Sequence, residues 1–209
     1  MIPRSLFGDN PPRNLITVPA CEACDNEKSL NDDFLRDMLV MDVQSSEHPL
    51  LQADLRNKMY RAVQRNLSAL GRLVVAESKD RALYTRGGIY LGSYPAVTIE
   101  ETRVSRIFSM IVRGLYYKAR KQRLPDDCVF KARRLPPLEE VNIWQHLAQL
   151  GCQYPYRLGD VFLCAFVTVE EDPAMTIWLL GFYNSAFFTV LTHAVDFDLE
   201  SYRAARQQN

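Results

Sequence analysis

The chain has 209 residues, of which 47% are hydrophobic and 24% are charged. This composition is typical of a globular protein and excludes a disordered chain, and the length suits one full domain with a small appended module. No apolar stretch approaches the ~18 residues that a bilayer span requires, and no signal-peptide core follows the first residues, so we expect no membrane partner. The chain has five Cys, an odd number with one close pair, which suits a reducing cytoplasm better than a secreted disulfide framework.

Charge is distributed unevenly, although Lys+Arg and Asp+Glu both number 25. Residues 1–49 carry 4 basic and 9 acidic side chains, residues 50–134 carry 18 and 7, and residues 135–209 carry 3 and 9. Because a polyanion responds to the local field, a neutral chain with a basic middle segment can bind nucleic acid. Solvated helix faces are the alternative explanation of the same charges.

The first forty residues contain the most informative local pattern. The apolar run at 15–18 predicts a short strand, and Cys21 and Cys24 follow it. Their spacing lets both thiolates reach one metal ion. After a polar step, Ser29 is a suitable N-cap for a helix with apolar residues at helical spacing. The order is therefore a strand, a two-cysteine turn and a helix.

Two further helices are predicted in the basic middle of the chain. One covers residues 50–70, and the other covers 99–122, where seven apolar residues from Val104 to Tyr116 recur at helical spacing. Between them, two apolar runs flank Gly87-Gly88, which indicates a β-hairpin.

The last third changes from helical to strand-like periodicity. A strand over 128–135 and a helix over 138–150 precede runs of β-branched and aromatic residues at 160–193, which predict an antiparallel meander. The predicted fold class is α+β: a partial ββα-type finger at residues 1–48, then an α+β domain at 49–209. That domain has basic helices within 50–134 and a C-terminal antiparallel sheet.

The N-terminal stretch resembles the second half of the HNH endonuclease motif, the ββα-metal nuclease finger. Four features of the sequence match this motif: Ile2-Pro3, Asn14-Leu15, the pair Cys21 and Cys24, and the step that holds Asn26 and Lys28. The resemblance covers about the first fifth of the chain.

The chain departs from the motif at three points. The motif's His would fall immediately before Met1, its first CxxC would lie further upstream, and Asp25 stands where the motif usually has Asn. The sequence thus predicts a finger cut off just after its catalytic base. A start assigned at an internal Met, a natural truncation and a degenerate gene would each give this pattern.

The resemblance implies metal-dependent hydrolysis of a DNA phosphodiester. It assigns catalytic positions to Asn14, Asp25 and Asn26, and a structural Zn²⁺ to Cys21 and Cys24, with a divalent ion such as Mg²⁺ at the scissile phosphate. Zn²⁺ would have two of its four ligands from these cysteines. Loss of a general base costs ~10²–10⁴ in rate, so we expect impaired cleavage by this chain.

A second expectation concerns nucleic-acid contacts in the basic segment. The candidate phosphate-binding residues are Lys28, Arg113, Lys118, Arg120, Lys121, Arg123, Arg133 and Arg134. His48 is expected to be a solvated loop residue. The alternative to a nuclease is a non-catalytic α+β domain that binds nucleic acid or a protein partner, and a homo-oligomer is left open.

Overall fold

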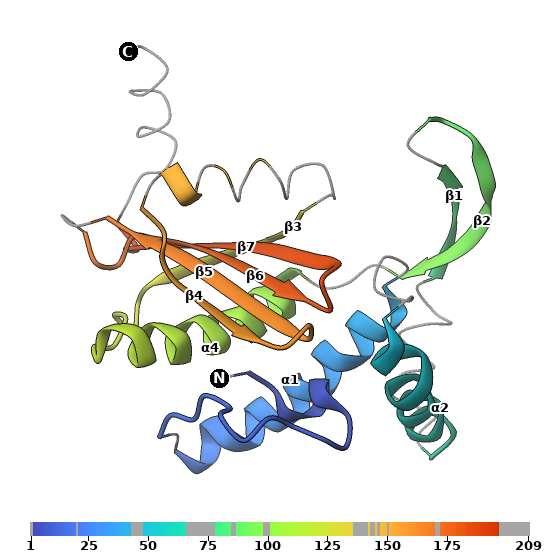
Figure 1. The fold of residues 1–209 in the computed structure, drawn as a ribbon, viewed down its shortest axis with the longest axis horizontal. Coiled ribbons are helices and arrows are strands. Elements are labelled where there is room, and N and C mark those ends of the chain that lie inside the picture. Colours follow the sequence, from blue (N-terminus) through green and yellow to red (C-terminus); the bar gives the residue numbers. More distant parts are fainter. Residues whose placement is uncertain are drawn as a thin grey trace.

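The computed structural model describes residues 2–19, 21–42, 48–65, 78–84, 87–97, 101–135, 151–169 and 172–196, with positions 142, 145 and 147–149. Within these residues the protein combines helices with two antiparallel sheets, so the predicted α+β class is confirmed. Figure 1 shows the larger sheet lying over helices α1 and α4, with a two-stranded sheet standing to one side.

The larger sheet has five antiparallel strands in the order β3-β7-β6-β5-β4. Their bounds are β3 Val129–Arg134, β4 Gln153–Leu158, β5 Phe162–Thr168, β6 Thr176–Phe182 and β7 Ala186–His193. The strand predicted at 128–135 and the meander predicted at 160–193 are confirmed. Strand β4 was not predicted. It lies at an edge of the sheet, where Pro155, which lacks a backbone N–H, is tolerated.

The centre of this sheet is closely packed around Gly181 on β6. Its register partners are Leu163 on β5 and Phe187 on β7. A Cβ atom added to Gly181 would lie 2.6 Å from Cε1 of Phe187 and 2.9 Å from Cγ of Leu163. A residue without a side chain is therefore required between these two neighbours.

Helix α4 (Glu101–Arg120) packs on one face of the sheet and confirms the helix predicted at 99–122. Its buried residues are Ile107, Phe108, Ile111, Val112, Gly114, Leu115 and Tyr116. The ring of Phe108 lies 4.7 Å from that of Phe188 and 6.2 Å from that of Phe182, measured between centroids. The helix continues through Gly114, because burial of this apolar stripe outweighs the ~1 kcal/mol that glycine costs in a helix.

The opposite face of the sheet carries a second, smaller apolar cluster. Leu147 lies there with Leu135, Ala165, Leu179 and Phe187. Positions 142, 145 and 147–149 are helical, as predicted for 138–150, and the remaining positions of that segment lie outside the described residues. Gly151 follows with a φ of 69°, the left-handed conformation that glycine adopts at helix ends.

The N-terminal segment differs from the predicted strand, turn and helix. A 3₁₀-helix, η1, spans Arg4–Phe7, and helix α1 spans Glu22–Met41. The strand predicted at 15–18 is wrong, because these residues have no regular secondary structure and pair with no strand of the described chain. A strand requires hydrogen-bonded neighbours, which a local apolar run does not supply. The ββα detail of the predicted finger is therefore not confirmed.

The N-cap predicted at Ser29 is also wrong, because α1 begins seven residues earlier, at Glu22. The carbonyl of Cys21 accepts a hydrogen bond from the N–H of Asp25 at 3.0 Å, so helical bonding starts at Cys21. Glu22 and Asp25 place negative charge in the first turn, where the helix dipole stabilises it. The polar step at 25–28 therefore lies within the first two turns of the helix, where Asp25 and Asn26 are exposed.

Two tyrosines attach the N-terminal segment to the sheet. The hydroxyl of Tyr183 donates to the carbonyl of Leu6 at 2.8 Å, and that of Tyr156 donates to the carbonyl of Asn14 at 2.9 Å. Ile2 is only 2% exposed. The main apolar cluster takes described residues from both sides of the predicted boundary at 48/49, so η1 and α1 share one core with the sheet.

The helix predicted at 50–70 is described as far as Arg65. A π-helical turn, η2, spans Leu51–Leu55 and continues directly into α2, Arg56–Arg65. Residues 66–77 lie outside the described part of the chain. No helix in that part is both long enough and apolar enough to cross a membrane.

The predicted hairpin forms the smaller sheet. Strand β1 (Ser78–Tyr84) pairs antiparallel with β2 (Tyr90–Val97) around the Gly87-Gly88 turn. No other described helix or strand packs extensively on these two strands. Figure 1 shows the hairpin projecting away from the five-stranded sheet.

Candidate functional site

The residues that match the nuclease motif lie around the start of α1. Cys21 immediately precedes the helix and is exposed, and Asp25 and Asn26 are exposed at its N-terminal end. Next to them, the carboxylate of Glu27 pairs with the guanidinium of Arg106 from α4, and this contact lowers the pKa of Glu27. The first turn of α1 is thereby joined to α4 while its polar residues face solvent.

Asn14 is exposed in a turn of the segment that leads to α1, and its carbonyl accepts a hydrogen bond from the hydroxyl of Tyr156. The side chain of Cys24 lies outside the described part of the structure. Within the described residues, no group of three or more His, Cys, Asp or Glu side chains is arranged to hold a metal ion. A structural Zn²⁺ takes four ligands, so Cys21 and Cys24 would supply only half of such a site. We therefore assign no chemical step to a metal ion here.

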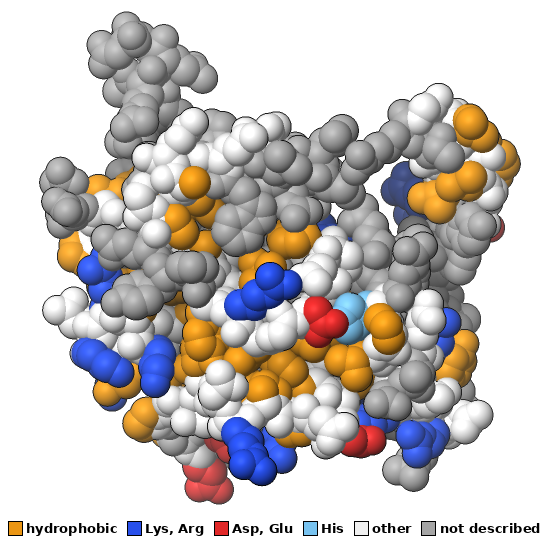
Figure 2. Space-filling model, in the orientation of Figure 1, with side chains coloured by type: hydrophobic (Ala, Val, Ile, Leu, Met, Phe, Trp, Pro, Cys, Tyr) orange, Lys and Arg blue, Asp and Glu red, His pale blue; other side chains and the backbone are white. Residues whose placement is uncertain are grey.

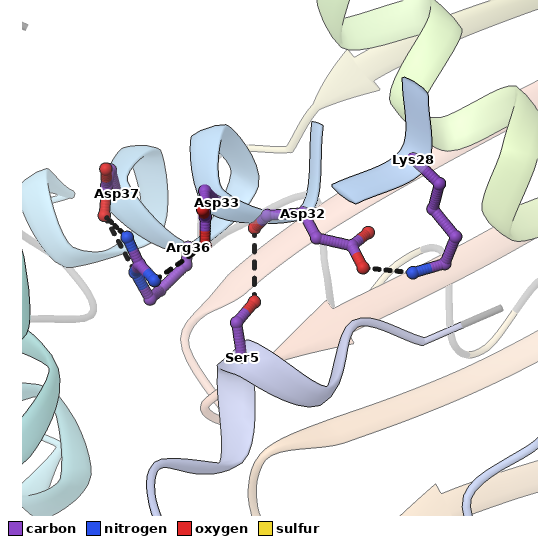
Figure 3. A network of polar contacts seen from close by, with 6 residues as sticks. All are labelled: Ser5, Lys28, Asp32, Asp33, Arg36 and Asp37. Atoms are coloured by element: carbon purple, nitrogen blue, oxygen red, sulfur yellow. Dashed lines mark hydrogen bonds and ion pairs between the residues drawn. The ribbon is translucent and has the colours of Figure 1, made fainter. Parts of the chain in front are cut away.

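Lys28 is engaged by its own helix. Its ammonium group pairs with the carboxylate of Asp32 one turn later, and both side chains are largely buried. The hydroxyl of Ser5 in η1 donates to the backbone carbonyl of Asp32 at 3.3 Å. Figure 3 shows this contact beside a second cluster on the same helix, in which Arg36 lies between Asp33 and Asp37. Lys28 is therefore paired within α1, and the backbone carbonyl of Asp32 joins α1 to η1.

Arg113 on α4 binds the turn that follows the helix. Its guanidinium donates to the carbonyls of Leu124, Pro125 and Asp126 at 3.1, 2.9 and 3.0 Å. It also lies over the ring of Phe130, with Cζ 4.9 Å from the ring centroid. Both terminal nitrogens of Arg113, which was predicted to bind phosphate, are therefore engaged in contacts within the fold.

Two more predicted phosphate ligands make contacts within the fold. Arg120 donates to Oγ1 of Thr168 at 2.6 Å. Arg134 pairs with Asp42 at 2.8 Å and donates to the carbonyl of Phe187 at 3.2 Å. Arg134 therefore joins the end of α1 to strand β7.

The remaining predicted cations are exposed. Lys118, Lys121 and Arg123 lie at the C-terminal end of α4, and no acidic group of the described chain pairs with them. We call these three residues the α4 basic cluster. Lys121 has a φ of 58° and its N–H donates to the carbonyl of Tyr117 at 2.8 Å, so this lysine takes the left-handed position that ends the helix.

Arg133 is exposed on β3, where it alternates with half-buried neighbours along the strand. Figure 2 shows lysine and arginine side chains at several separate places on the displayed face, with apolar and uncharged atoms between them. On this face, the basic residues do not form one continuous patch.

The prediction that His48 is a solvated loop residue is wrong. Its side chain is 9% exposed, and its ring centroid lies 5.0 Å from that of Tyr183. Its Nε2 lies 3.1 Å from Oδ2 of Asp160, a distance that suits an ion pair when the ring is protonated, although the angles are not those of a hydrogen bond. The histidine is buried because the segment after α1 packs against the turn between β4 and β5.

Sequence reasoning also missed Arg106, whose partner Glu27 is 79 residues away along the chain. It likewise missed the exposure of the hairpin. Apolar character predicted the two strands correctly, but nothing in the local pattern showed that their side chains would remain at the surface.

Comparisons with protein-family models, with curated proteins and with solved structures found no match for this chain.

Proposed function

We propose that the protein binds double-stranded DNA without sequence preference, and that its first 41 residues are the second half of an HNH-type finger. The observation that carries DNA binding is the α4 basic cluster. Its three cations are exposed at one end of a helix whose position is fixed by a buried apolar stripe. Cations that are held in place, and that no acidic group of the described residues neutralises, can replace the counterions of phosphate groups.

The start of α1 supports the finger part of the proposal. Cys21, Asp25 and Asn26 lie at the start of α1, and all three are exposed. A carboxylate and an amide at this position have the chemistry that the motif uses near a metal or a phosphate. Of the catalytic groups that the motif implies, the general base has no counterpart in the matched residues. We therefore propose binding as the function of this chain and assign no cleavage step to it.

The experiment is a fluorescence-anisotropy titration of labelled duplex DNA at several salt concentrations. Each neutralised phosphate contributes a slope of about −0.9 to the plot of log K against log salt. Three contacts alone would lower the affinity roughly 40-fold between 50 and 200 mM salt. Duplexes of different sequence should give the same values.

A matched pair of variants identifies the surface involved. Lys121→Glu with Arg123→Glu should weaken binding and reduce the steepness of the salt slope by about 1.8. The control, Arg61→Glu with Arg157→Glu, changes the net charge equally at two exposed residues that each bond a nearby backbone carbonyl. Absence of binding at low salt, or equal loss in both variants, would contradict the proposal and favour a protein-interaction domain.

A further inference from the structure

The β1–β2 hairpin exposes large apolar side chains at its far end. Leu83, Tyr84, Ile89, Tyr90 and Leu91 are 37%, 57%, 67%, 54% and 51% exposed. We call these five residues the hairpin tip. Single exposed apolar residues are common on proteins, but a group of this size on one projecting element marks an interaction surface.

Side-chain contacts join residues near the end of the hairpin. The rings of Tyr84 and Tyr90 are cross-strand partners with centroids 5.5 Å apart, and the hydroxyls of Tyr90 and Ser93 lie 2.9 Å apart. An isolated two-stranded hairpin is only marginally stable in water. A ribbon that carries its apolar side chains outward therefore gains stability when a partner covers them.

The remainder of the hairpin is basic. Residues 78–97 contain Lys79, Arg81 and Arg86 against the single acid Asp80. Lys79 and Arg81 are exposed and, two residues apart on β1, they lie on the same face as Leu83. We call Lys79 and Arg81 the hairpin stem. Cations thus precede the apolar tip along one strand, so the hairpin has charge complementary to a polyanion.

We propose that the hairpin is a DNA-binding arm. In this arrangement the stem contacts phosphates of a duplex, and the tip enters the minor groove, where apolar side chains wedge between base pairs and bend the DNA. The inference rests on the proposed function, because it takes duplex DNA as the ligand and adds a second contact surface. Figure 1 places the hairpin on the opposite side of the molecule from the end of α4, so the two surfaces can be varied independently.

Two observations favour DNA over a protein partner or a second copy of the chain. Both faces of β1 from Lys79 to Tyr84 are exposed, and a groove contacts a ribbon on both sides, whereas a docked protein surface covers one. The stem cations also have no role in a purely apolar protein interface. β-Ribbons and β-sheets are among the elements that bind DNA through the minor groove as well as the major groove.

The test compares three variants of the full chain on a duplex labelled at both ends for energy transfer. The tip variant is Ile89→Ser with Leu91→Ser, and the stem variant is Lys79→Glu with Arg81→Glu. The control is Ile177→Ser with Val195→Ser, which removes two exposed apolar side chains from the five-stranded sheet and the segment after it. Affinity, salt slope, DNA bending and the mass of the protein in solution are measured for each.

We expect the tip variant to lose the bend and about tenfold in affinity while keeping the salt slope, because wedging and stacking do not release counterions. The stem variant should reduce the steepness of the slope by about 1.8, and the control should match the parent protein. If the parent protein binds and bends DNA and the tip variant does so equally, the arm is refuted while the proposed function stands. If the parent protein binds no duplex, both are refuted. A tip variant that changes the protein's mass and not its DNA binding would assign the hairpin to contacts between copies, which also refutes the arm.

Discussion

Replacing Arg113 by Gln separates a structural arginine from a DNA-binding one. The guanidinium makes three hydrogen bonds to backbone carbonyls of residues 124–126 and covers the ring of Phe130. Its side chain is 32% exposed, so water replaces part of what is lost, and we take each bond near the low end of its range. Together with the cation–π contact, the substitution should reduce the free energy of unfolding by about 2–3 kcal/mol.

For a chain of this length, such a change lowers Tm by roughly 4–12 °C. Urea unfolding followed by tryptophan fluorescence measures the free energy, since Trp178 is 1% exposed and its environment changes on unfolding. The salt slope of DNA binding, measured in parallel, should stay unchanged, because Arg113 makes its contacts within the fold.

Lys118→Gln is the matched control, with the same change of charge on the same helix. Lys118 is exposed, so its substitution should leave Tm unchanged and reduce the steepness of the salt slope by about 0.9. If Arg113→Gln kept its stability and changed the slope as Lys118→Gln does, the assignment of Arg113 to the fold would be refuted.

Two further predictions follow from packing and burial. Gly181→Ala should reduce the free energy of unfolding by about 1–3 kcal/mol in urea titrations, because its Cβ would overlap Phe187 and Leu163. Adding Phe187→Leu should recover part of that loss, and an unchanged stability of Gly181→Ala would contradict the close packing. Burial raises the pKa of the Cys164 thiol to about 12, so at pH 8 this group stays protonated and should resist alkylation in the native protein. Exposed Cys21 should be labelled under the same conditions, as peptide mass spectrometry would show, and native labelling of Cys164 would contradict its burial.

Local patterns predicted the elements that local interactions determine. The apolar stripe of α4 predicted both the helix and its buried face, because helical periodicity is a property of neighbouring residues. Gly87-Gly88 between apolar runs predicted the hairpin for the same reason. The run at 15–18 has similar apolar character but no partner strand among the described residues, and pairing depends on distant parts of the chain.

The predicted phosphate ligands also depend on contacts with distant parts of the chain, which local sequence does not reveal. Sequence gives the charge of Arg113, Arg134 and Lys121 equally. The fold then turns the first towards carbonyls of a following turn and the second towards Asp42, 92 residues away, while the third stays exposed at a helix end. Which cations remain available to a ligand follows from tertiary contacts, so charge alone did not distinguish them.

The hydrogen bond between Tyr183 and Leu6 joins residues 177 positions apart. During synthesis at ~5–20 residues per second, Leu6 is added roughly 9–35 s before Tyr183. Through that interval Ile2, Leu6 and Phe7, all buried in the finished protein, have no sheet to pack against. In the growing chain these apolar residues therefore stay exposed until the strands of the five-stranded sheet have been made, and the core that contains them forms late in synthesis.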